Sequence, residues 1–270
     1  MDNYAVFGNP IEHSLSPTIH TQFAEQTGCD ITYTKILAAQ DGFTESALDF
    51  ASSGGKGFNI TVPFKIEAFK LANHLTLNAK TAGAVNTIKI ENGELYGENT
   101  DGRGLVNDLC NNLGLSLEGK DILILGAGGA TQGILLPLLE QKPVRILVAN
   151  RTKAKAEKLA IDFAKHGKVC GFGMDQIKAK PLDIVINATS ASLAGEMPAI
   201  LPGVAEGAFC YDLMYGQKTP FMDWAEQSGA NGISDGLGML VEQAAEAYYF
   251  WRGVMPKTDE VLSSLRATIG

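Results

Sequence analysis

The stretch that decides the fold runs from Asp121 to Thr131 and reads DILILGAGGAT. A run of four aliphatic residues is typical of a buried strand, and Gly126 and Gly128 after it are typical of a tight turn that opens a helix. The first glycine permits the turn, and the second lets a pyrophosphate approach the backbone at the helix N-terminus. Thr131 stands where a third glycine is usual. This context predicts a dinucleotide site, and the alternative is a plain strand–helix turn.

The end of the next expected strand indicates which dinucleotide binds. Asn150 follows Gly126 at close to the ~20-residue spacing at which an NAD site places its acid, but no acid is present there. Cations occupy the first turn of the next helix, where the helix dipole disfavours each by ~0.3–1 kcal/mol. A 2′-phosphate would reverse this penalty, which favours NADP over a solvated basic face. The expected cofactor residues are Gly126, Ala127, Gly128, Gly129, Ala130, Asn150, Arg151, Thr152, Lys153, Ala154 and Lys155.

Strand and helix patterns alternate outward from this stretch, which indicates an α/β protein with parallel strands and right-handed crossovers. We expect strands at Tyr4–Gly8, Ile31–Leu37, Gly57–Val62, Ala84–Ile90, Glu94–Gly97, Asp121–Leu125, Val144–Asn150, Leu182–Ala188 and Phe209–Leu213. Asn92-Gly93 predicts a hairpin turn. Helices are expected from Ser16 to Gly28, at Asp41–Ala51, from Pro63 onward and at Gly102–Leu113. A further helix is expected from the glycine turn to about Gln141, followed by helices at Thr152–Lys165, from Thr219 to near Gly229, at Met239–Trp251 and at Thr258–Leu265.

Composition limits the possible classes of protein. The chain has 270 residues and a formal net charge of −8, and an acidic balance argues against nucleic acid as the main partner. No apolar run reaches the ~18 residues of a membrane helix, and the first residues lack a signal-peptide pattern. The four cysteines are widely spaced without a C-x-x-C, so neither a metal site nor a disulfide framework is expected. These features favour a cytoplasmic protein with a small-molecule partner.

A polar loop after the first strand offers two hydroxyl groups, on Ser14 and Ser16. Pro17 is expected to hold Ser16 extended, and if Leu15 is extended too, the two hydroxyls point to the same side. Beside a helix N-terminus they could bind a carboxylate. The alternative, equally weighted, is that Ser16 only caps the helix and Ser14 is solvated.

Lys65 is the strongest candidate for proton transfer. If Pro63 is the first helical residue, Lys65 is the third, and a lysine there faces the positive end of the helix dipole. Such a position is a poor structural choice, so a lysine there could shuttle a proton. Asn86 and Asp101 lie at structural junctions, and each alone could be a turn former or a cap.

Seven motifs together resemble one family. They are HSLSP at 13–17, NITVPFK at 59–65, GAVNT at 83–87, NTDG at 99–102, GAGGA at 126–130, NRT at 150–152 and GLGMLVEQA at 236–244. In this order and spacing they resemble shikimate dehydrogenase over nearly the whole chain. The resemblance implies NADPH-dependent reduction of 3-dehydroshikimate to shikimate, and the reverse, in aromatic amino-acid biosynthesis, by a monomer or homodimer.

The resemblance also implies roles and domains. Ser14, Ser16 and Tyr215 would hold the substrate carboxylate, and Lys65, paired with Asp101, would give or take the proton. The residues around the ring hydroxyls and carbonyl would be Thr61, Lys65, Asn86, Asp101 and Gln243, with Leu213 and Gly236 near the nicotinamide. The implied fold is two α/β domains: a substrate domain of residues 1–101 and 237–270, to which the last helices return, and a Rossmann-like, doubly wound NADP domain of residues 102–236.

The sequence leaves two rival functions open. One is a quinate/shikimate dehydrogenase with relaxed use of NAD and NADP, whose relatives often carry an acid where Asn150-Arg151-Thr152 stands. The other is a non-catalytic module that binds a shikimate-like metabolite, against which the presence of both Lys65 and Asp101 argues. Gln132 and Lys155 stand where the family often has arginine.

Overall fold

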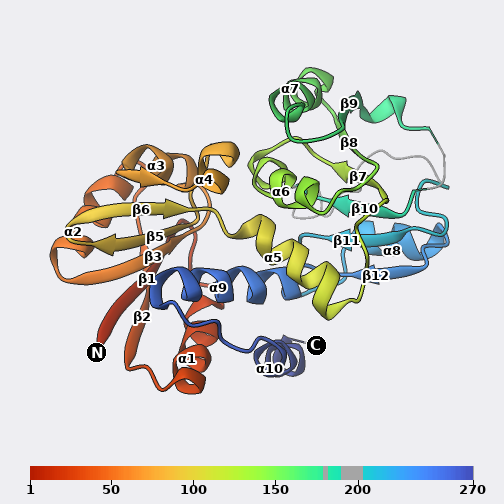
Figure 1. Ribbon diagram of the computed structural model, residues 1–270. Coiled ribbons are helices and arrows are strands. Elements are labelled where there is room, and N and C mark those ends of the chain that lie inside the picture. Colours follow the sequence, from red (N-terminus) through yellow and green to blue (C-terminus); the bar gives the residue numbers. More distant parts are fainter. Residues whose placement is uncertain (179–181, 190–202, 270) are drawn as a thin grey trace. The chain divides into compact units, whose positions relative to one another are not determined.

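The computed structural model describes residues 1–178, 182–189 and 203–269 (Figure 1). The chain forms two compact units. Unit 1 contains Met1–Gly104 and Leu240–Arg266, and unit 2 contains Leu105–Met239 with the last residues from Ala267. The chain passes between the units inside three helices, α5 (Asp101–Asn107), α9 (Leu237–Arg252) and, near its end, α10 (Asp259–Ile269).

Unit 1 is built on a six-stranded sheet of order β2-β1-β3-β5-β6-β4. The first three strands are parallel, and β5 runs antiparallel to both of its neighbours. The strands are β1 (Asp2–Gly8), β2 (Ile31–Leu37), β3 (Gly55–Ile60), β4 (His74–Leu75), β5 (Thr87–Glu91) and β6 (Glu94–Glu98). The helices, besides the shared ones, are α1 (Ser16–Thr27), α2 (Phe43–Ser52), α3 (Lys65–Leu71) and α4 (Leu77–Ala82).

Both faces of the unit 1 sheet are apolar. Side chains alternate between the faces along each strand, and in β1 the buried side chains on both faces are apolar. Ala5 and Phe7 of β1 belong to a core that includes residues of α2, α3 and α4. Tyr4 and Val6 point to the other face and pack with Trp251 of α9. The helices therefore cover the sheet on two sides, as the fold class requires.

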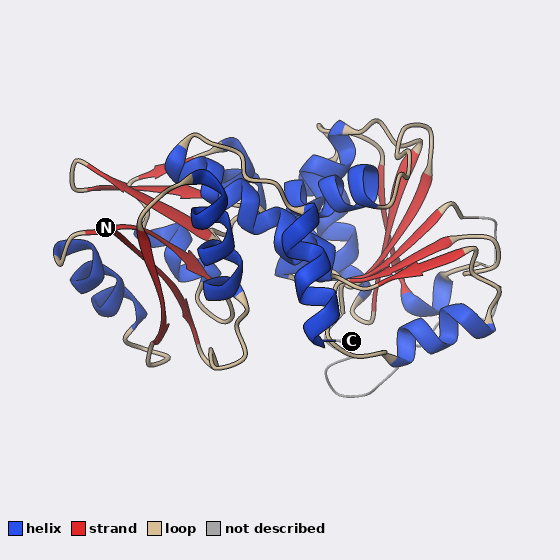
Figure 2. Ribbon diagram, turned by 90° about the horizontal axis from the view of Figure 1, so that it is seen from below, coloured by secondary structure: helices blue, strands red, loops and turns tan. Residues whose placement is uncertain are grey.

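Unit 2 is a six-stranded, fully parallel sheet of order β12-β11-β10-β7-β8-β9. This order is that of a doubly wound dinucleotide-binding fold, so the predicted fold class is confirmed (Figure 2 shows the strands in red). The strands are β7 (Asp121–Leu125), β8 (Arg145–Asn150), β9 (Val169–Gly173), β10 (Ile184–Asn187), β11 (Phe209–Asp212) and β12 (Gly232–Ser234). The helices are α6 (Gly129–Glu140), α7 (Lys153–Phe163) and α8 (Pro220–Gln227), and a π-helical turn (Asp108–Asn112) follows α5.

The strands of unit 2 are buried on both faces, as parallel strands usually are. Ile122 and Ile124 pack in a core that includes residues of α6 and α7, whereas Leu123 and Leu125 pack in a second core that includes residues of α8. Within the described part of the chain, no helix is both long and apolar enough to cross a membrane.

The structure contains the predicted hairpin and also short elements that the sequence did not predict. The hairpin is confirmed, because Asn92 and Gly93 both have positive φ between β5 and β6. Other strands and helices lie within a few residues of expectation. The sequence did not predict β4, α4, β9 or β12, since the three strands are two to five residues long and the helix six.

Two predictions about helix starts were wrong. The first helix has Leu15 as its N-cap residue, in αR conformation and without a side-chain cap, so Ser16 is already helical rather than an extended N-cap. The helix α3, expected to begin at Pro63, begins at Lys65 with Phe64 as its N-cap residue. A turn at residues 12–13 precedes the first of these helices, and a turn at residues 62–64 precedes the second.

His20 of α1 is a buried titratable group below the sheet of unit 1. Its ring is fully buried and stacks on Tyr33, with the ring centroids 4.5 Å apart. Burial lowers the pKa of His20 to about 3, against a smaller opposing effect of the Asn59 side chain. An unfolded histidine titrates near pH ~6.5, so the unfolded chain takes up this proton first. The free energy of unfolding is therefore unaffected by this group above about pH 6.5, and it decreases as the pH falls from there toward 3.

Replacing His20 with phenylalanine is expected to flatten the pH dependence of stability. The wild-type free energy of unfolding should fall by up to ~1.4 kcal/mol more per pH unit than that of His20→Phe, between about pH 6 and 4. Phenylalanine keeps an aromatic ring against Tyr33 but cannot be protonated. Urea unfolding at several pH values measures both slopes, and equal slopes would mean that the pKa of His20 is the same in the folded and the unfolded chain.

Candidate functional site

The polar candidates of unit 1 follow the ends of strands at one edge of its sheet. Ser14 follows β1, and Lys65 follows β3. Because β5 is antiparallel to β3, its first residue lies beside the end of β3, where Asn59 pairs with Thr87. The next strand, β6, turns back again, so that Asp101 also follows a strand at this edge. Carboxyl ends of strands are where α/β proteins usually bind ligands.

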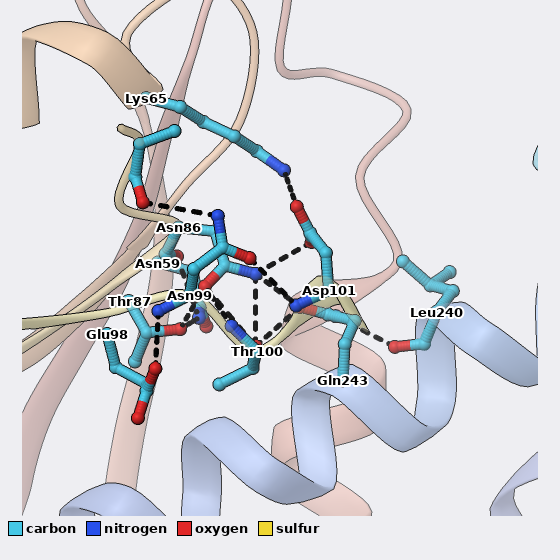
Figure 3. Close-up of polar contacts among 11 residues, drawn as sticks. Asn59, Lys65, Asn86, Thr87, Glu98, Asn99, Thr100, Asp101, Leu240 and Gln243 are labelled. Carbon is cyan, nitrogen blue, oxygen red and sulfur yellow. Dashed lines mark hydrogen bonds and ion pairs between the residues drawn. The ribbon is translucent and has the colours of Figure 1, made fainter. Parts of the chain in front are cut away.

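Lys65 and Asp101 form an ion pair, with Lys65 Nζ 2.6 Å from Asp101 Oδ2 (Figure 3). Each is the first residue of its helix, α3 or α5. That position is unfavourable for the lysine and favourable for the carboxylate, so the ion pair offsets the misplaced cation. The Lys65 side chain remains 31% exposed, against 12% for Asp101, so its ammonium group can still reach a ligand.

Two amide side chains complete this cluster. Asn86 Nδ2 donates to Asp101 Oδ1 at 2.7 Å and lies 3.3 Å from Gln243 Oε1. Gln243 is itself oriented, because its Nε2 donates to the carbonyl of Leu240 in the same helix, α9. The structure therefore brings Lys65, Asn86, Asp101 and Gln243 together within unit 1 (Figure 3).

The serine pair has a different geometry from the one expected. Ser14 Oγ lies 3.2 Å from Ser16 Oγ and accepts from the Ser16 N–H at 3.3 Å. The hydroxyls are adjacent although Leu15 is in αR conformation, so a turn rather than an extended segment brings them together. Thr61 lies at the same edge of the sheet, because its N–H donates to the carbonyl of Phe7 at the end of β1.

In unit 2, the glycine turn lies at the point where the strand order reverses. Gly126 follows β7 with φ +101°, and a Cβ there would lie 2.9 Å from the carbonyl oxygen of Ala188, just after β10. Only glycine fits this contact. A Cβ at Gly128 or Gly129 would meet nothing within 4 Å, so the backbone there is open to a ligand. Thr131, in place of the third glycine, is buried and donates to the Gly126 carbonyl.

Asn150 connects this turn to the basic loop after β8. Its Oδ1 accepts from the Ala127 N–H at 3.2 Å, and its Nδ2 donates to the carbonyl of Thr152 at 2.9 Å. Lys153 pairs with Glu157 at 3.3 Å. Arg151 and Lys155 are exposed, and no carboxylate of residues 1–178, 182–189 or 203–269 pairs with either. Their charges are therefore available to an anion.

A second loop of unit 2 carries the remaining candidates. The Gly236 N–H donates to the Met214 carbonyl at 2.8 Å, and a Cβ at Gly236 would collide with the carbonyl of Leu213. Asp212, at the end of β11, accepts from the Met214 N–H at one end of the loop and from the Thr219 hydroxyl at the other. Tyr215 is half-buried, and burial raises its pKa, so it remains a phenol that can donate a hydrogen bond at neutral pH.

Sequence reasoning missed polar residues that lie behind the Lys65–Asp101 pair. They are Asn59, Thr87, Asn99 and Thr100, and all are buried. Each lies inside one of the quoted motifs, and Asn59 interrupts an otherwise apolar strand end. A polar residue in a buried strand, at the edge where the candidates gather, is the signal that could have found them.

Comparison with known proteins places the chain in one family. Three family models match: the shikimate dehydrogenase substrate binding domain over residues 6–88, shikimate / quinate 5-dehydrogenase over residues 108–195, and the shikimate 5′-dehydrogenase C-terminal domain over residues 236–266. The shikimate dehydrogenase (NADP+) of Ruthia magnifica is 65% identical over 267 residues, which cover 99% of this chain and 100% of that protein. The chain belongs to the shikimate dehydrogenase family.

Solved structures agree with this family assignment. An Ael1 enzyme from Pseudomonas putida is 43% identical, with a TM-score of 0.94 and 98% of both chains covered. The shikimate 5-dehydrogenase of Thermus thermophilus, in complex with NADP(H) and shikimate, is 28% identical, with a TM-score of 0.86 and 99% of both chains covered. The shikimate dehydrogenase family predicted from the seven motifs is thus confirmed.

Proposed function

We propose that this chain catalyses the reversible, NADP-dependent interconversion of shikimate and 3-dehydroshikimate. The observation that carries the proposal is the Lys65–Asp101 pair, in which a partly exposed ammonium is held 2.6 Å from a mostly buried carboxylate. Removing a hydride from an alcohol carbon requires removing the hydroxyl proton as well, and the protein must supply the group that takes it. Lys65 is placed to do this, which distinguishes an enzyme from a module that only binds.

In this reaction each candidate residue of unit 1, together with Tyr215 of unit 2, has a stated task. Lys65 takes the hydroxyl proton during oxidation of shikimate and gives it back to the carbonyl oxygen during reduction. Asp101 orients the Lys65 ammonium, and Asn86 and Gln243 offer amide groups to the ring hydroxyls beside it. Ser14 and Ser16 donate to the substrate carboxylate, and we assign Tyr215 and Thr61 as further substrate contacts.

The residues of unit 2 fit NADP. The open backbone at Gly128 and Gly129 suits a pyrophosphate, and the free charges of Arg151 and Lys155 suit a 2′-phosphate. Leu213 and Gly236 would lie against the nicotinamide, which supplies the hydride chemistry when bound. We therefore assign residues 102–236 as the cofactor domain, and residues 1–101 with 237–270 as the substrate domain.

A spectrophotometric assay tests the proposal. Purified protein is mixed with shikimate and NADP, with shikimate and NAD, and with quinate and either cofactor, and the absorbance of the reduced nicotinamide is followed. We expect turnover with shikimate and NADP well above the other pairs. Comparable rates with quinate or NAD would indicate the relaxed quinate/shikimate activity, and binding of shikimate without turnover in any pair would indicate a non-catalytic module.

Ser14→Ala tests the carboxylate contact. One hydrogen bond to a charged group is lost while Ser16 remains, so we expect the dissociation constant for shikimate to rise about tenfold. The melting temperature should hardly change, because the lost bond to the Ser16 N–H is long at 3.3 Å. Calorimetric titration with shikimate and a thermal melt measure the two effects. A lower melting temperature with unchanged affinity would mean that Ser14 only stabilises the turn.

Two broader assignments complete the proposal. The four cysteines are free thiols, which suits a reducing compartment, and we assign the enzyme to the cytoplasm. We propose that it acts as a monomer or homodimer, which size-exclusion chromatography with light scattering would decide.

A further inference from the structure

A chain of buried hydrogen bonds runs behind the Lys65–Asp101 pair. The Tyr33 hydroxyl lies 2.7 Å from Asn59 Oδ1, and Asn59 Nδ2 lies 3.0 Å from Thr87 Oγ1. Thr87 Oγ1 lies in turn 3.0 Å from Asn86 Oδ1. Thr87 is completely buried, so it cannot touch a substrate directly. Buried polar groups are costly unless they are paired, so the direction of each bond in this chain matters.

A backbone carbonyl fixes the direction of the hydrogen bonds at the Asn59 end of this series. Asn59 Nδ2 also lies 3.3 Å from the main-chain oxygen of Asn86, which can only accept. The amide nitrogen of Asn59 must therefore face β5, and its oxygen must face Tyr33, whose hydroxyl then donates. Thr87 accepts the second N–H of Asn59. Its own proton is consequently left to donate to Asn86 Oδ1.

The other end is fixed by a backbone N–H. The Thr100 N–H can only donate, and it lies 2.9 Å from Asn86 Oδ1. Asn86 Oδ1 therefore accepts from both Thr100 and Thr87, and the Asn86 amide nitrogen is turned toward Asp101 Oδ1 (Figure 3). That leaves Asp101 Oδ2 to Lys65. The reversed amide would set its oxygen against the carboxylate, which is repulsive.

We propose that Thr87 is a positioning residue for the proton transfer: its hydroxyl, backed by Asn59 and Tyr33, holds the Asn86 amide so that Asp101 stays aimed at Lys65. This inference rests on the proposed function, in which Lys65 and Asp101 handle the proton. Thr87 would act through its hydrogen bond to Asn86 and not through a contact with the substrate.

Thr87→Val and Thr87→Ser form a matched pair that separates the hydroxyl from the packing. Valine keeps the shape but removes the donor to Asn86 and the acceptor for Asn59, whereas serine keeps the hydroxyl and loses only a methyl group. We expect Thr87→Val to lower kcat for shikimate oxidation roughly tenfold with an unchanged KM for NADP. Thr87→Ser should stay within about twofold of the wild type.

The outcomes are distinct. Equal losses in the valine and serine variants, or wild-type kcat in Thr87→Val, would overturn the inference. Should Thr87→Val fail to fold, Tyr33→Phe removes the far end of the chain and should lower kcat in the same direction. The control is Tyr248→Phe, which loses a buried hydroxyl that bonds to Thr27 and takes no part in this series of hydrogen bonds. Its kcat should stay at the wild-type value. A wild-type protein that cannot oxidise shikimate would overturn the proposed function itself, whereas an active wild type with equal variants would overturn only this inference.

Discussion

Replacing Lys65 with alanine is expected to lower kcat for shikimate oxidation by about 10²–10⁴, the range typical of general acid–base catalysis. The ammonium is held 2.6 Å from Asp101 Oδ2 and is still partly exposed, so its loss removes the group that exchanges the proton with the substrate oxygen. The KM for NADP should change little, because the cofactor residues lie in the other unit. Steady-state kinetics with each substrate varied in turn measure both parameters.

Two further variants sharpen this prediction. Lys65→Arg should restore little activity, because a guanidinium does not give up its proton near neutral pH. Lys70→Ala removes an exposed lysine from the same helix, α3, and should behave like the wild type. If Lys65→Ala raised only the KM for shikimate at wild-type kcat, Lys65 would be a binding residue and the proton would come from another group.

The candidate cluster could be predicted from the sequence where one residue conflicts with its local structure. Lys65 was found because a cation at a helix start is unfavourable, and Arg151 was found for the same reason. Thr87 and Asn59 give a weaker signal: each is a polar residue at the end of an apolar strand, where it could equally well be solvated. Only the pairing of β3 with β5 shows that both are buried and bonded to each other, and a register of that kind is not readable from either strand alone.

The elements of the fold also differ in how far the sequence predicts them. The strand and turn around Gly126 were predictable because four consecutive aliphatic residues followed by Gly126 and Gly128 are a strong local signal. The strand β9 is half-exposed and rich in glycine, so its sequence carries little strand preference, and it is held by pairing with β8. Ser16 is not the N-cap residue, because Leu15 before it holds that position and is in αR conformation. A serine before proline is a helix-start signal that locates the turn to within a residue or two only.

Replacing Arg151 with alanine is expected to raise the KM for NADP about tenfold to a hundredfold, which corresponds to the ~1.5–3 kcal/mol of a hydrogen bond to a charged group. Arg151 is exposed beside the glycine turn, and Asn150 ties its loop to Ala127. The KM for NAD should hardly change, because NAD has no 2′-phosphate for the guanidinium to bind. The ratio of kcat/KM for the two cofactors therefore reports the loss directly.

Lys158→Ala is the matched control for this experiment. Lys158 is exposed on the same helix, α7, but pairs with Asp162, so its removal should leave both KM values unchanged. An adenosine fragment that carries a 2′-phosphate should inhibit the wild type more strongly than the fragment without it, and Arg151→Ala should lose that difference. An equal rise in KM for NADP and NAD would instead show that Arg151 stabilises the loop, and the choice between cofactors would then rest on Lys155, the other basic side chain there that no described carboxylate neutralises.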